Sequence, residues 1–476
     1  MNIEARLIWR DVRMTRTTWI EKLGREDGNV TVFSVFMILI ILMLSGAAVD
    51  VMRYESIRVK LQHTMDRAVL AAADLDQEQD PNDVVVDYVT QIGAGDALTG
   101  VTVDTGLNYR TVTAEAQTTM DTLFMRLSGV PAMTAPAFSM AEERIAKVEI
   151  SMVLDISGSM AWDAVASGNQ AGQTKLEALQ DAADIFIDTV IRPETQGLIS
   201  LSLVPYSQQV NAGPDLFDEM NIDVEHGYSH CVEFSDAAYR NTEFDSSSYF
   251  DQTQHFEWNR SDDLRYTVCP RFTYERITPI SQDAAALKAQ IAALQPRAGT
   301  AIYLGMKWAS ALLDPTFRGV TSNLVAGGKV DPVFAGRPVD FTDDETLKTV
   351  ILMTDGQNSS SMRIKNHHYN SSSEKQRWAS NNLVRWVQNR GHSTNSYVDW
   401  HMNMNRGDNL LEDACDAAKD QGIIIWSIGF EVQDHGAEVM RRCASSDAHF
   451  FRVEGVEITE AFHAIARQIN NLRLTQ

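Results

Sequence analysis

The pattern of hydrophobic and polar positions changes several times along this chain of 476 residues. Residues 30–49, VTVFSVFMILIILMLSGAAV, form an apolar run without a single charge. A helix of about 20 such residues, rising 1.5 Å per residue, spans roughly 30 Å of hydrocarbon. We therefore predict a transmembrane helix at 30–49, after a tail at 1–29. A cleaved signal peptide is the alternative, with small residues at 46–48, but this run exceeds the usual apolar core of such peptides.

Two further patterns follow the apolar run. At 50–80 apolar residues recur every three or four positions, which predicts an amphipathic helix that packs against its own domain. The stripe consists of Tyr54, Ile57, Leu61, Met65, Ala68 and Ala72. From 81 to 145 the period shortens to two, as in GVTVDTGLNYRTVTAEAQTTM, which predicts a small β-rich module.

Strand and helix patterns alternate through residues 146–476, which indicates a doubly wound α/β domain with a mostly parallel sheet. We expect Thr174 to cap its first helix. The predicted strands cover 148–155, 198–207, 347–356, 422–430 and 449–455, and the predicted helices cover 174–190, 283–295, 301–313, 410–422 and 458–472. About 330 residues exceed what this pattern needs. We assign the excess to loop insertions near 207–271, 314–345 and 357–410, which are rich in Asn, Ser, Asp and aromatic residues.

Charge changes the picture in two ways. A formal net charge of −23 argues against a nucleic-acid binder, which would carry a basic surface. The tail at 1–29 is basic and favours a cytoplasmic location, which leaves the bulk of the chain exported. Its cations are Arg6, Arg10, Arg13, Arg16, Lys22 and Arg25. Four cations soon after the apolar run weaken this contrast, namely Arg53, Arg58, Lys60 and Arg67.

All four cysteines, Cys231, Cys269, Cys415 and Cys443, follow the apolar run and show no CxxC spacing typical of zinc sites. An exported domain permits disulfides. Of the three pairings we favour Cys231 with Cys269 and Cys415 with Cys443, because each closes a local loop. Four buried free thiols are the alternative.

The stretch VEISMVLDISGSMAW ends a predicted strand in Asp155 and continues with Ser157 and Ser159. Thr300 precedes a helix in RAGTAIYLG, and Asp355 ends another apolar strand in VILMTDGQN. The carboxyl ends of parallel strands meet at one edge of a sheet, where ligands bind. Mg2+ prefers oxygen ligands and keeps exchangeable water. These five residues therefore predict a site for Mg2+, with Mn2+ or Ca2+ as alternatives, that leaves a position for an external carboxylate.

At these residues the sequence resembles the von Willebrand factor A family. The family's metal-ion-dependent adhesion site has the pattern DxSxS, then a distant Thr, then a strand-end Asp. The resemblance runs from about residue 147 to the C-terminus, although the gap from Ser159 to Thr300 is longer than usual in the family. It implies an A-type domain that holds a metal ion with Asp155, Ser157, Ser159, Thr300 and Asp355.

The N-terminal stretch REDGNVTVFSVFMILIILMLSGAAVDVMRYESIRVKLQHTMDRAVLAAA is similar to TadG-like proteins of tight-adherence (Flp) pilus loci. ITPISQDAAALKAQIAALQPRAGTAIYLGMKWASALLDP resembles the same group. The resemblance implies a single-pass anchor in a bacterial inner membrane and a periplasmic A-type domain, with release toward the surface left open. Prepilins of these loci carry Glu five residues beyond a cleavage Gly. Phe33 holds that position after Gly28, which argues against processing as a pilin.

We therefore expect an adhesion or assembly protein that binds a protein partner through Mg2+. The partner would be a pilus or envelope component that offers an Asp or Glu carboxylate. The alternative is an envelope scaffold whose metal site is structural or vestigial. We expect no enzyme, because the chain lacks the G-x-S-x-G elbow and the P-loop.

Two further groups in the sequence could in principle be metal ligands. Asp163, four residues after Ser159, resembles a neighbouring cation site of some integrin A-type domains, but we interpret it as a surface carboxylate. His367 and His368 are adjacent, so in an extended segment they would point to opposite sides. We interpret them as loop histidines.

Overall fold

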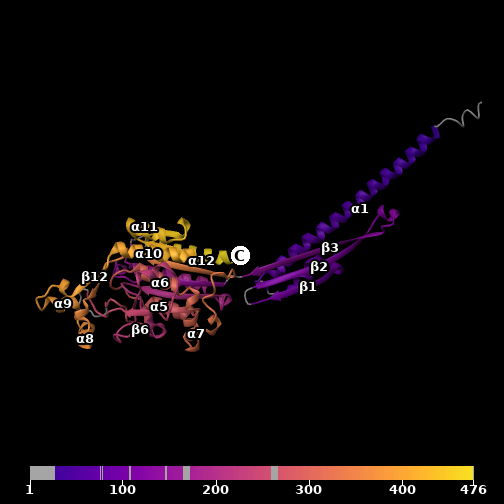
Figure 1. The fold of residues 1–476 in the computed structure, drawn as a ribbon. Helices are drawn as coiled ribbons and strands as arrows, with labels where there is room; N and C mark the ends of the chain where they lie inside the picture. The colour runs from indigo at the N-terminus through magenta and orange to yellow at the C-terminus, as the bar shows by residue number, and fades with distance from the viewer. Residues whose placement is uncertain are drawn as a thin grey trace, which may run out of the picture. The chain divides into compact units, whose positions relative to one another are not determined.

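The computed structural model describes residues 27–474 apart from six short gaps (Figure 1). The gaps are residues 76, 78, 107–108, 145–146, 165–171 and 259–265. The chain divides into two compact units, residues 1–143 and 144–476. Each unit has its own core, and each is described by itself.

The first unit begins with α1 (Asp27–Ala73), one helix of 47 residues and about 70 Å. It is the one helix among the described residues that is long and apolar enough to cross a membrane. Its side chains from Val30 to Leu44 are exposed. The stripe at 50–80 predicts that the helix continues beyond the apolar run at 30–49, and α1 does run from one range into the other without a break. It has no proline, and it ends at Ala73 rather than near residue 80.

The C-terminal half of α1 packs on a sheet with strand order β1-β2-β3. The strands are β1 (Leu98–Thr105), β2 (Tyr109–Asp121) and β3 (Ala132–Arg144), and β1 pairs with β2 in antiparallel fashion. The buried part of the predicted stripe enters this core, so the helix does pack against its own domain. The core includes Leu61, Met65, Ala68, Ala72, Val112, Ala114, Ala116 and Ala137.

A helix corrects the prediction that the β-rich module starts at residue 81. The helix α2 (Pro81–Gln91) comes before the first strand. Asp80 caps it by accepting a hydrogen bond from the backbone N–H of Asn82, and Pro81 lies in its first turn. These start signals outweigh the strand preference of the valines that follow. Those valines, at positions 84, 85 and 89, are buried on one face of α2.

The second unit is a six-stranded sheet with helices on both faces, as the sequence predicts. The strand order is β14-β13-β10-β4-β5-β9. The pairings from β14 to β5 are parallel, and β9 pairs with β5 in antiparallel fashion. The strands are β4 (Lys147–Asp155), β5 (Ile199–Tyr206), β9 (Thr278–Ser281), β10 (Thr346–Thr354), β13 (Ile424–Phe430) and β14 (Phe450–Val453).

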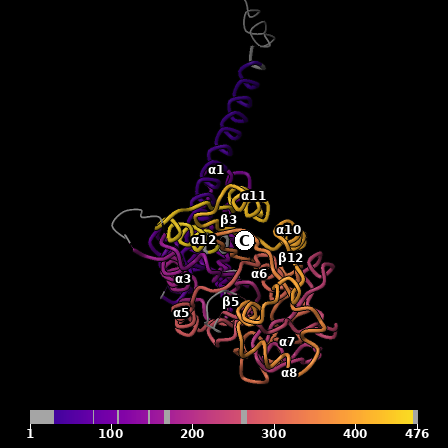
Figure 2. Tube along the Cα trace, turned by 90° about the vertical axis from the view of Figure 1, so that its left-hand side faces the viewer, coloured from indigo at the N-terminus to yellow at the C-terminus, as the bar shows by residue number. Residues whose placement is uncertain are grey.

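The two faces of the sheet bury separate cores. Figure 2 shows α3 and α5 on one side of β5 and α6 and α10 on the other. Along β4, Ile150 and Met152 face the α3 side, whereas Val153 faces the α6 side. One face carries α3 (Lys175–Val190), α5 (Ala284–Ala293) and α12 (Glu457–Leu474), and the other α6 (Ile302–Ala311), α10 (Met404–Asp420) and α11 (Asp434–Cys443).

Helix boundaries confirm the predicted cap and correct one start. Thr174 and Glu177 form a reciprocal capping box at the start of α3. The helix α10 begins at Met404, before the predicted position 410, because Asn403 caps a polar first turn that carries no apolar period. The sequence did not predict α11.

The insertions fold into small elements and are not structureless loops. The first contains α4 (Gly213–Phe217) and the sheet β6-β8-β7, the second α7 (Arg318–Ala326), and the third the hairpin β11-β12 with α8 and α9. Their bounds are β6 (Asn221–Asp223), β7 (Val232–Glu233), β8 (Tyr249–Gln252), β11 (Ser361–Ile364), β12 (Val398–Met402), α8 (Ser372–Ser380) and α9 (Leu383–Gln388). The first and third insertions share a core, in which Phe256 and Val268 meet Trp378.

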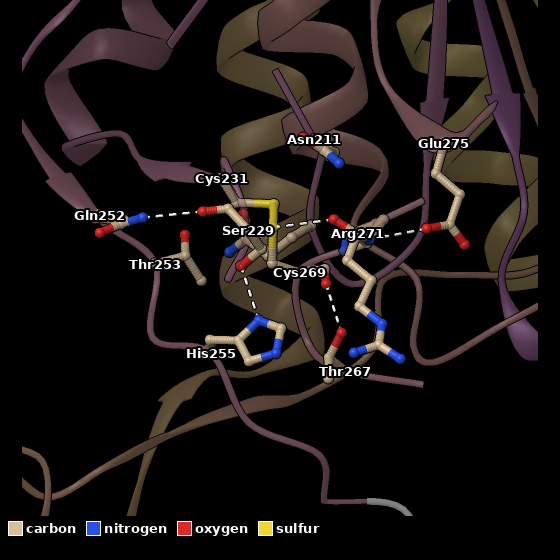
Figure 3. The surroundings of a disulfide bond; sticks show 12 residues. Asn211, Ser229, Cys231, Gln252, Thr253, His255, Thr267, Cys269, Arg271 and Glu275 are labelled. Carbon is tan, nitrogen blue, oxygen red and sulfur yellow. Dashed lines mark hydrogen bonds between the residues drawn. A yellow bond between two sulfur atoms is a disulfide. The ribbon is translucent and has the colours of Figure 1, made fainter. Parts of the chain in front are cut away.

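Both predicted disulfides are present. Cys231 bonds to Cys269 within the first insertion, and Cys415 of α10 bonds to Cys443 of α11. Figure 3 shows the first bond among buried polar side chains. Each bond closes a local loop, of 38 and 28 residues in separation.

Candidate metal centre

The five predicted ligands lie at the carboxyl edge of the central strands. Asp155 is the last residue of β4, and Asp355 directly follows β10. Both strands are parallel neighbours, so their ends lie side by side. Asp155 is fully buried and Asp355 is 5% exposed. The sheet therefore brings two carboxylates from distant parts of the chain to one place.

Hydrogen bonds join four of these residues into one network. The backbone N–H of Ser157 donates to Asp155 Oδ1 at 2.7 Å. The hydroxyls of Ser157 and Ser159 lie 3.0 Å apart, and Ser159 Oγ donates to Asp355 Oδ1 at 2.7 Å. The hydroxyl of Thr354 donates to Asp155 Oδ2 at 2.7 Å. The two serines thus bridge the two carboxylates.

Backbone contacts place the loop of Thr300 beside this network. The carbonyl of Ala298 accepts from Gly158 N–H at 3.1 Å, which ties the loop to the DxSxS segment. The N–H of Thr300 donates to Ser359 Oγ at 2.7 Å, and its carbonyl accepts from Ser359 N–H at 2.8 Å. Thr300 is therefore held between the loops that follow the two aspartates.

Strained backbone occurs at the same edge. Ala298 and Glu431 have φ angles of 52° and 53°, a left-handed conformation that costs free energy for residues other than glycine. At Gly299 a Cβ atom would lie 2.6 Å from Ser359 Oγ, so a side chain there would displace the Thr300 loop. Such strain at a buried polar cluster is typical of functional sites.

Two charged residues that sequence reasoning missed complete the cluster. Lys175, the first residue of α3, places Nζ 3.1 Å from Asp355 Oδ2 and 3.5 Å from Glu431 Oε2. Its side chain is 8% exposed, and that of Glu431 is 7% exposed. Glu431 directly follows β13, so the strand-end rule that identified Asp355 applied to it as well. No pattern in the sequence marked Lys175.

The two aspartates perturb each other. Burial, and then the charge of Asp355, raises the pKa of Asp155 to about 7. Burial also raises the pKa of Asp355, although the hydrogen bond from Ser159 and the charge of Lys175 oppose this. Two buried carboxylates so close together resist being ionised at once. A bound dication would relieve that repulsion.

The donor set fits a hard dication. Among the described residues no group of three or more His, Cys, Asp or Glu side chains is arranged to hold a metal ion. A shell at this edge would therefore need hydroxyl oxygens beside the two carboxylates. The shell would consist of Asp155, Ser157, Ser159, Thr300 and Asp355, with water in the remaining positions. Oxygen-only ligands with few carboxylates suit Mg2+ better than zinc.

The other two groups weighed from the sequence lie apart from this network. Asp163 is exposed on the loop after Ser159. His367 and His368 do not point to opposite sides, because they lie in a 3-10 turn rather than an extended segment. Their ring centroids are 4.1 Å apart, and His368 stacks on Tyr397 at 4.0 Å.

A buried ion pair connects the first insertion to the site. The N–H of Arg297 donates to the carbonyl of Ile156, inside the DxSxS segment, at 2.8 Å. Its guanidinium binds both carboxylate oxygens of Glu275, at 2.7 and 2.8 Å, and the carbonyl of Thr267 at 2.7 Å. Figure 3 shows Thr267 next to the disulfide partner Cys269, and Glu275 on the other side of Arg271. The disulfide therefore ties the two ends of the insertion to each other, and the contacts of Arg297 hold its end near Thr267 against the DxSxS segment.

The first and third insertions also enclose a polar hollow of about 970 Å³. Opposite charges face each other across it: Lys375 lies 3.3 Å from Glu225, and Arg363 pairs with Glu233, to which Arg363 Nε donates at 2.9 Å. Surface concavities of mixed charge on inserted loops commonly carry recognition.

Comparison with known protein families finds one match, in the N-terminal segment. Residues 28–75 match the family described as putative Flp pilus-assembly TadE/G-like. The match covers α1 and little more, so it speaks to this segment and not to the second unit. No protein with a curated description matches the chain.

Solved structures with similar folds include pilus proteins. The von Willebrand factor domain of the type V pili tip protein Mfa5 from Porphyromonas gingivalis shares 16% identity and a TM-score of 0.35, over 70% of this chain and 97% of that one. The pilus adhesin SpaC from Lactobacillus rhamnosus GG shares 13% sequence identity and a TM-score of 0.32, over 78% of this chain and 34% of that one. A von Willebrand factor type A protein from Catenulispora acidiphila shares 11% sequence identity and a TM-score of 0.28, over 78% of this chain and 50% of that one. At these scores the fold assignment comes from the strand order and not from the likenesses.

Proposed function

We propose that this protein is a membrane-anchored adhesion or assembly protein of a tight-adherence (Flp) pilus system, which binds a protein partner through Mg2+ at a metal-ion-dependent adhesion site. The observation that carries the proposal is the junction of Asp155 and Asp355 by two bridging serines at one sheet edge. The TadE/G-like anchor segment supports the pilus context.

The proposed binding step needs an open metal position. Two carboxylates leave a dication short of negative ligands, and Mg2+ exchanges its waters. A partner Asp or Glu would replace one water and complete the shell. The hydroxyls of Ser157, Ser159 and Thr300 would orient the ion without adding charge. The polar hollow between the insertions would then discriminate among carboxylate-bearing partners by its own charge pattern.

Calorimetry with Mg2+ on the full chain in lipid nanodiscs tests the metal site. Ser157→Ala and Thr300→Ala each remove one hydroxyl and should weaken Mg2+ binding without unfolding the domain. Asp155→Ala should be more severe, because it removes a charge and the acceptor that orders Ser157. Ser322→Ala, an exposed serine on α7, is the matched control. Heat of binding that is the same in all four variants would reject the site.

The proposed topology places the tail at 1–29 in the cytoplasm, the apolar run at 30–49 across a bacterial inner membrane, and everything after Val49 in the periplasm. The basic tail and the disulfides support it. Alkaline phosphatase fused after residue 80 should be active, and a cytoplasmic reporter there should be inactive. The reverse pattern would reject this orientation.

A scaffold role is the second candidate, and Lys175 favours it. Its ammonium already neutralises part of the charge at Asp355, so the carboxylates have partners without a metal ion. In that case the site is structural or vestigial, and other surfaces make the contacts. Pull-down from crosslinked envelopes separates the two roles. Capture that a chelator abolishes supports metal-dependent binding, and capture that survives both chelator and Thr300→Ala supports the scaffold.

A further inference from the structure

The connection between β2 and β3 in the first unit carries an unusual apolar tip. Residues 122–131 join the strands, and four of their apolar side chains lie in solvent contact. These are Leu123 (56% exposed), Phe124 (41%), Leu127 (78%) and Val130 (38%). Exposed apolar side chains gathered on one tip mark an interaction surface. Figure 1 shows this connection reaching along α1 beyond the rest of the sheet.

Contacts at Gly46 and Asp50 hold the tip against α1. Asp50, which is fully buried, accepts hydrogen bonds from the N–H groups of Leu123, Phe124 and Met125 at 2.9, 2.7 and 2.8 Å. Gly46 allows the ring of Phe124 to approach, since a Cβ atom at Gly46 would lie 2.4 Å from that ring. A carboxylate with three N–H partners fixes the position of the tip along the helix axis.

These contacts lie at the C-terminal end of the apolar run. Gly46 lies inside the run at 30–49 and Asp50 follows it directly. At 1.5 Å per residue, the contact at Gly46 lies about 5 Å inside the end of the run. Interfacial apolar side chains are buried by roughly 5–10 Å at the boundary between headgroups and acyl chains. Two cations flank the tip: Arg126 is exposed, and Arg53 lies one turn beyond Asp50.

We propose that this tip is a second membrane contact, in which Leu123, Phe124 and Leu127 enter the leaflet on the side of the small sheet while Arg53 and Arg126 meet lipid phosphates. The inference rests on the proposed anchoring of α1 in a bilayer. The continuity of the tip with the apolar surface of α1 selects lipid as its occupant over another protein. Together, helix and tip make two points of attachment that limit the tilt and rotation of the first unit.

Depth measurements on the full chain in nanodiscs test this proposal. The native cysteines are all disulfide-bonded, so a single introduced cysteine can carry a spin label. Leu127→Cys reports on the tip, Leu39→Cys on the apolar run, and Thr105→Cys is the matched control. Thr105 is exposed and pairs with Arg110 at the start of β2. Arg110 is 11 residues from Asp121 at the tip end of that strand, which places Thr105 roughly 35 Å from the tip.

We expect the label at position 127 to be reached by oxygen from the lipid and shielded from a water-soluble nickel reagent, with an oxygen-to-nickel ratio at least ~5-fold above that at position 105. Asp50→Asn should lower that ratio at 127 and leave it unchanged at 39. A label at 127 that the nickel reagent reaches freely, with 39 protected, would refute the tip contact and leave the anchor standing. Shielding from both reagents would mean that protein covers the tip, which also refutes it. Free access at 39 would reject the anchor itself.

Discussion

Lys175 Nζ lies 3.1 Å from Asp355 Oδ2, so the candidate metal centre already contains a positive charge supplied by the protein. The same ammonium lies 3.5 Å from Glu431 Oε2, at the end of the neighbouring strand β13. A resident cation beside a ligand for an external cation lowers the affinity of the site by charge repulsion.

The first prediction follows from that repulsion. Lys175→Met keeps the length of the side chain and removes its charge, and it should tighten Mg2+ binding by ~10-fold, equivalent to about 1.4 kcal/mol. Lys288→Met, which removes a cation paired with Asp184 and Asp188 on the surface, is the control. Calorimetry measures both. Weaker Mg2+ binding by Lys175→Met would show instead that the lysine positions Asp355.

The second prediction concerns the buried pair of Arg297 and Glu275. Arg297→Met should lower the free energy of unfolding by about 3–5 kcal/mol, because it leaves the buried Glu275 carboxylate without its cation. Lys329→Met, which breaks a half-exposed pair with Asp215, should cost less than about 1 kcal/mol. Urea titration followed by tryptophan fluorescence compares them. Equal losses would contradict the assigned role of the buried pair.

The third prediction concerns acid. Burial, and then the charges of His226, Arg271 and Arg297, lowers the pKa of His255 to about 3. A lowered pKa favours the folded state above the ordinary value near 6.5, and that contribution is lost as the pH falls from 6.5 toward 3. His255→Asn keeps an acceptor for Ser229 and does not titrate, so it should reduce the stability lost between pH 7.5 and pH 5 by about 2 kcal/mol.

His392→Asn, at an exposed histidine, is the control for that acid experiment. Urea titrations at the two pH values give the difference directly. If His255→Asn loses as much stability on acidification as the unmodified protein, His255 does not determine the acid sensitivity.

The fourth prediction concerns the disulfides. Replacing Cys231 and Cys269 together by serine should lower the free energy of unfolding by about 3–4 kcal/mol, and so should replacing Cys415 and Cys443, since the two loops are of similar length. Intact-mass analysis after alkylation without reductant should show no labelled thiol in the exported protein. Labelling of all four cysteines would exclude both bonds and weaken the periplasmic assignment.

Sequence patterns identified what depends on strong local signals. The apolar strands that end in Asp155 and Asp355 were visible as short runs, and the parallel order of such strands brings their ends together without further information. The same reasoning gave both disulfides, because each pairing closes a local loop. Each strand end is recognisable from a few neighbouring residues, although Asp155 and Asp355 themselves are far apart in the sequence.

Features that depend on tertiary contacts were missed. Lys175 was placed at a helix start, but only the packing of α3 against the sheet brings its ammonium to Asp355. The helix α2 is a different kind of miss, because its start signals Asp80 and Pro81 are local and were visible in the sequence beside the valines that favour a strand. The clamp between Asp50 and the β2–β3 connection joins residues more than 70 positions apart, and no periodicity reports such a contact.

The unbroken course of α1 has a mechanical consequence. One continuous helix carries both the exposed apolar run, which we propose to cross the membrane, and the buried stripe under the small sheet, with no break between them. A thinner bilayer, which long apolar helices accommodate by tilting, would therefore swing the small sheet through the same angle. With α1 anchored as we propose, bilayer thickness would set the orientation of the small sheet, and a force on that sheet would be transmitted along the helix axis into the membrane.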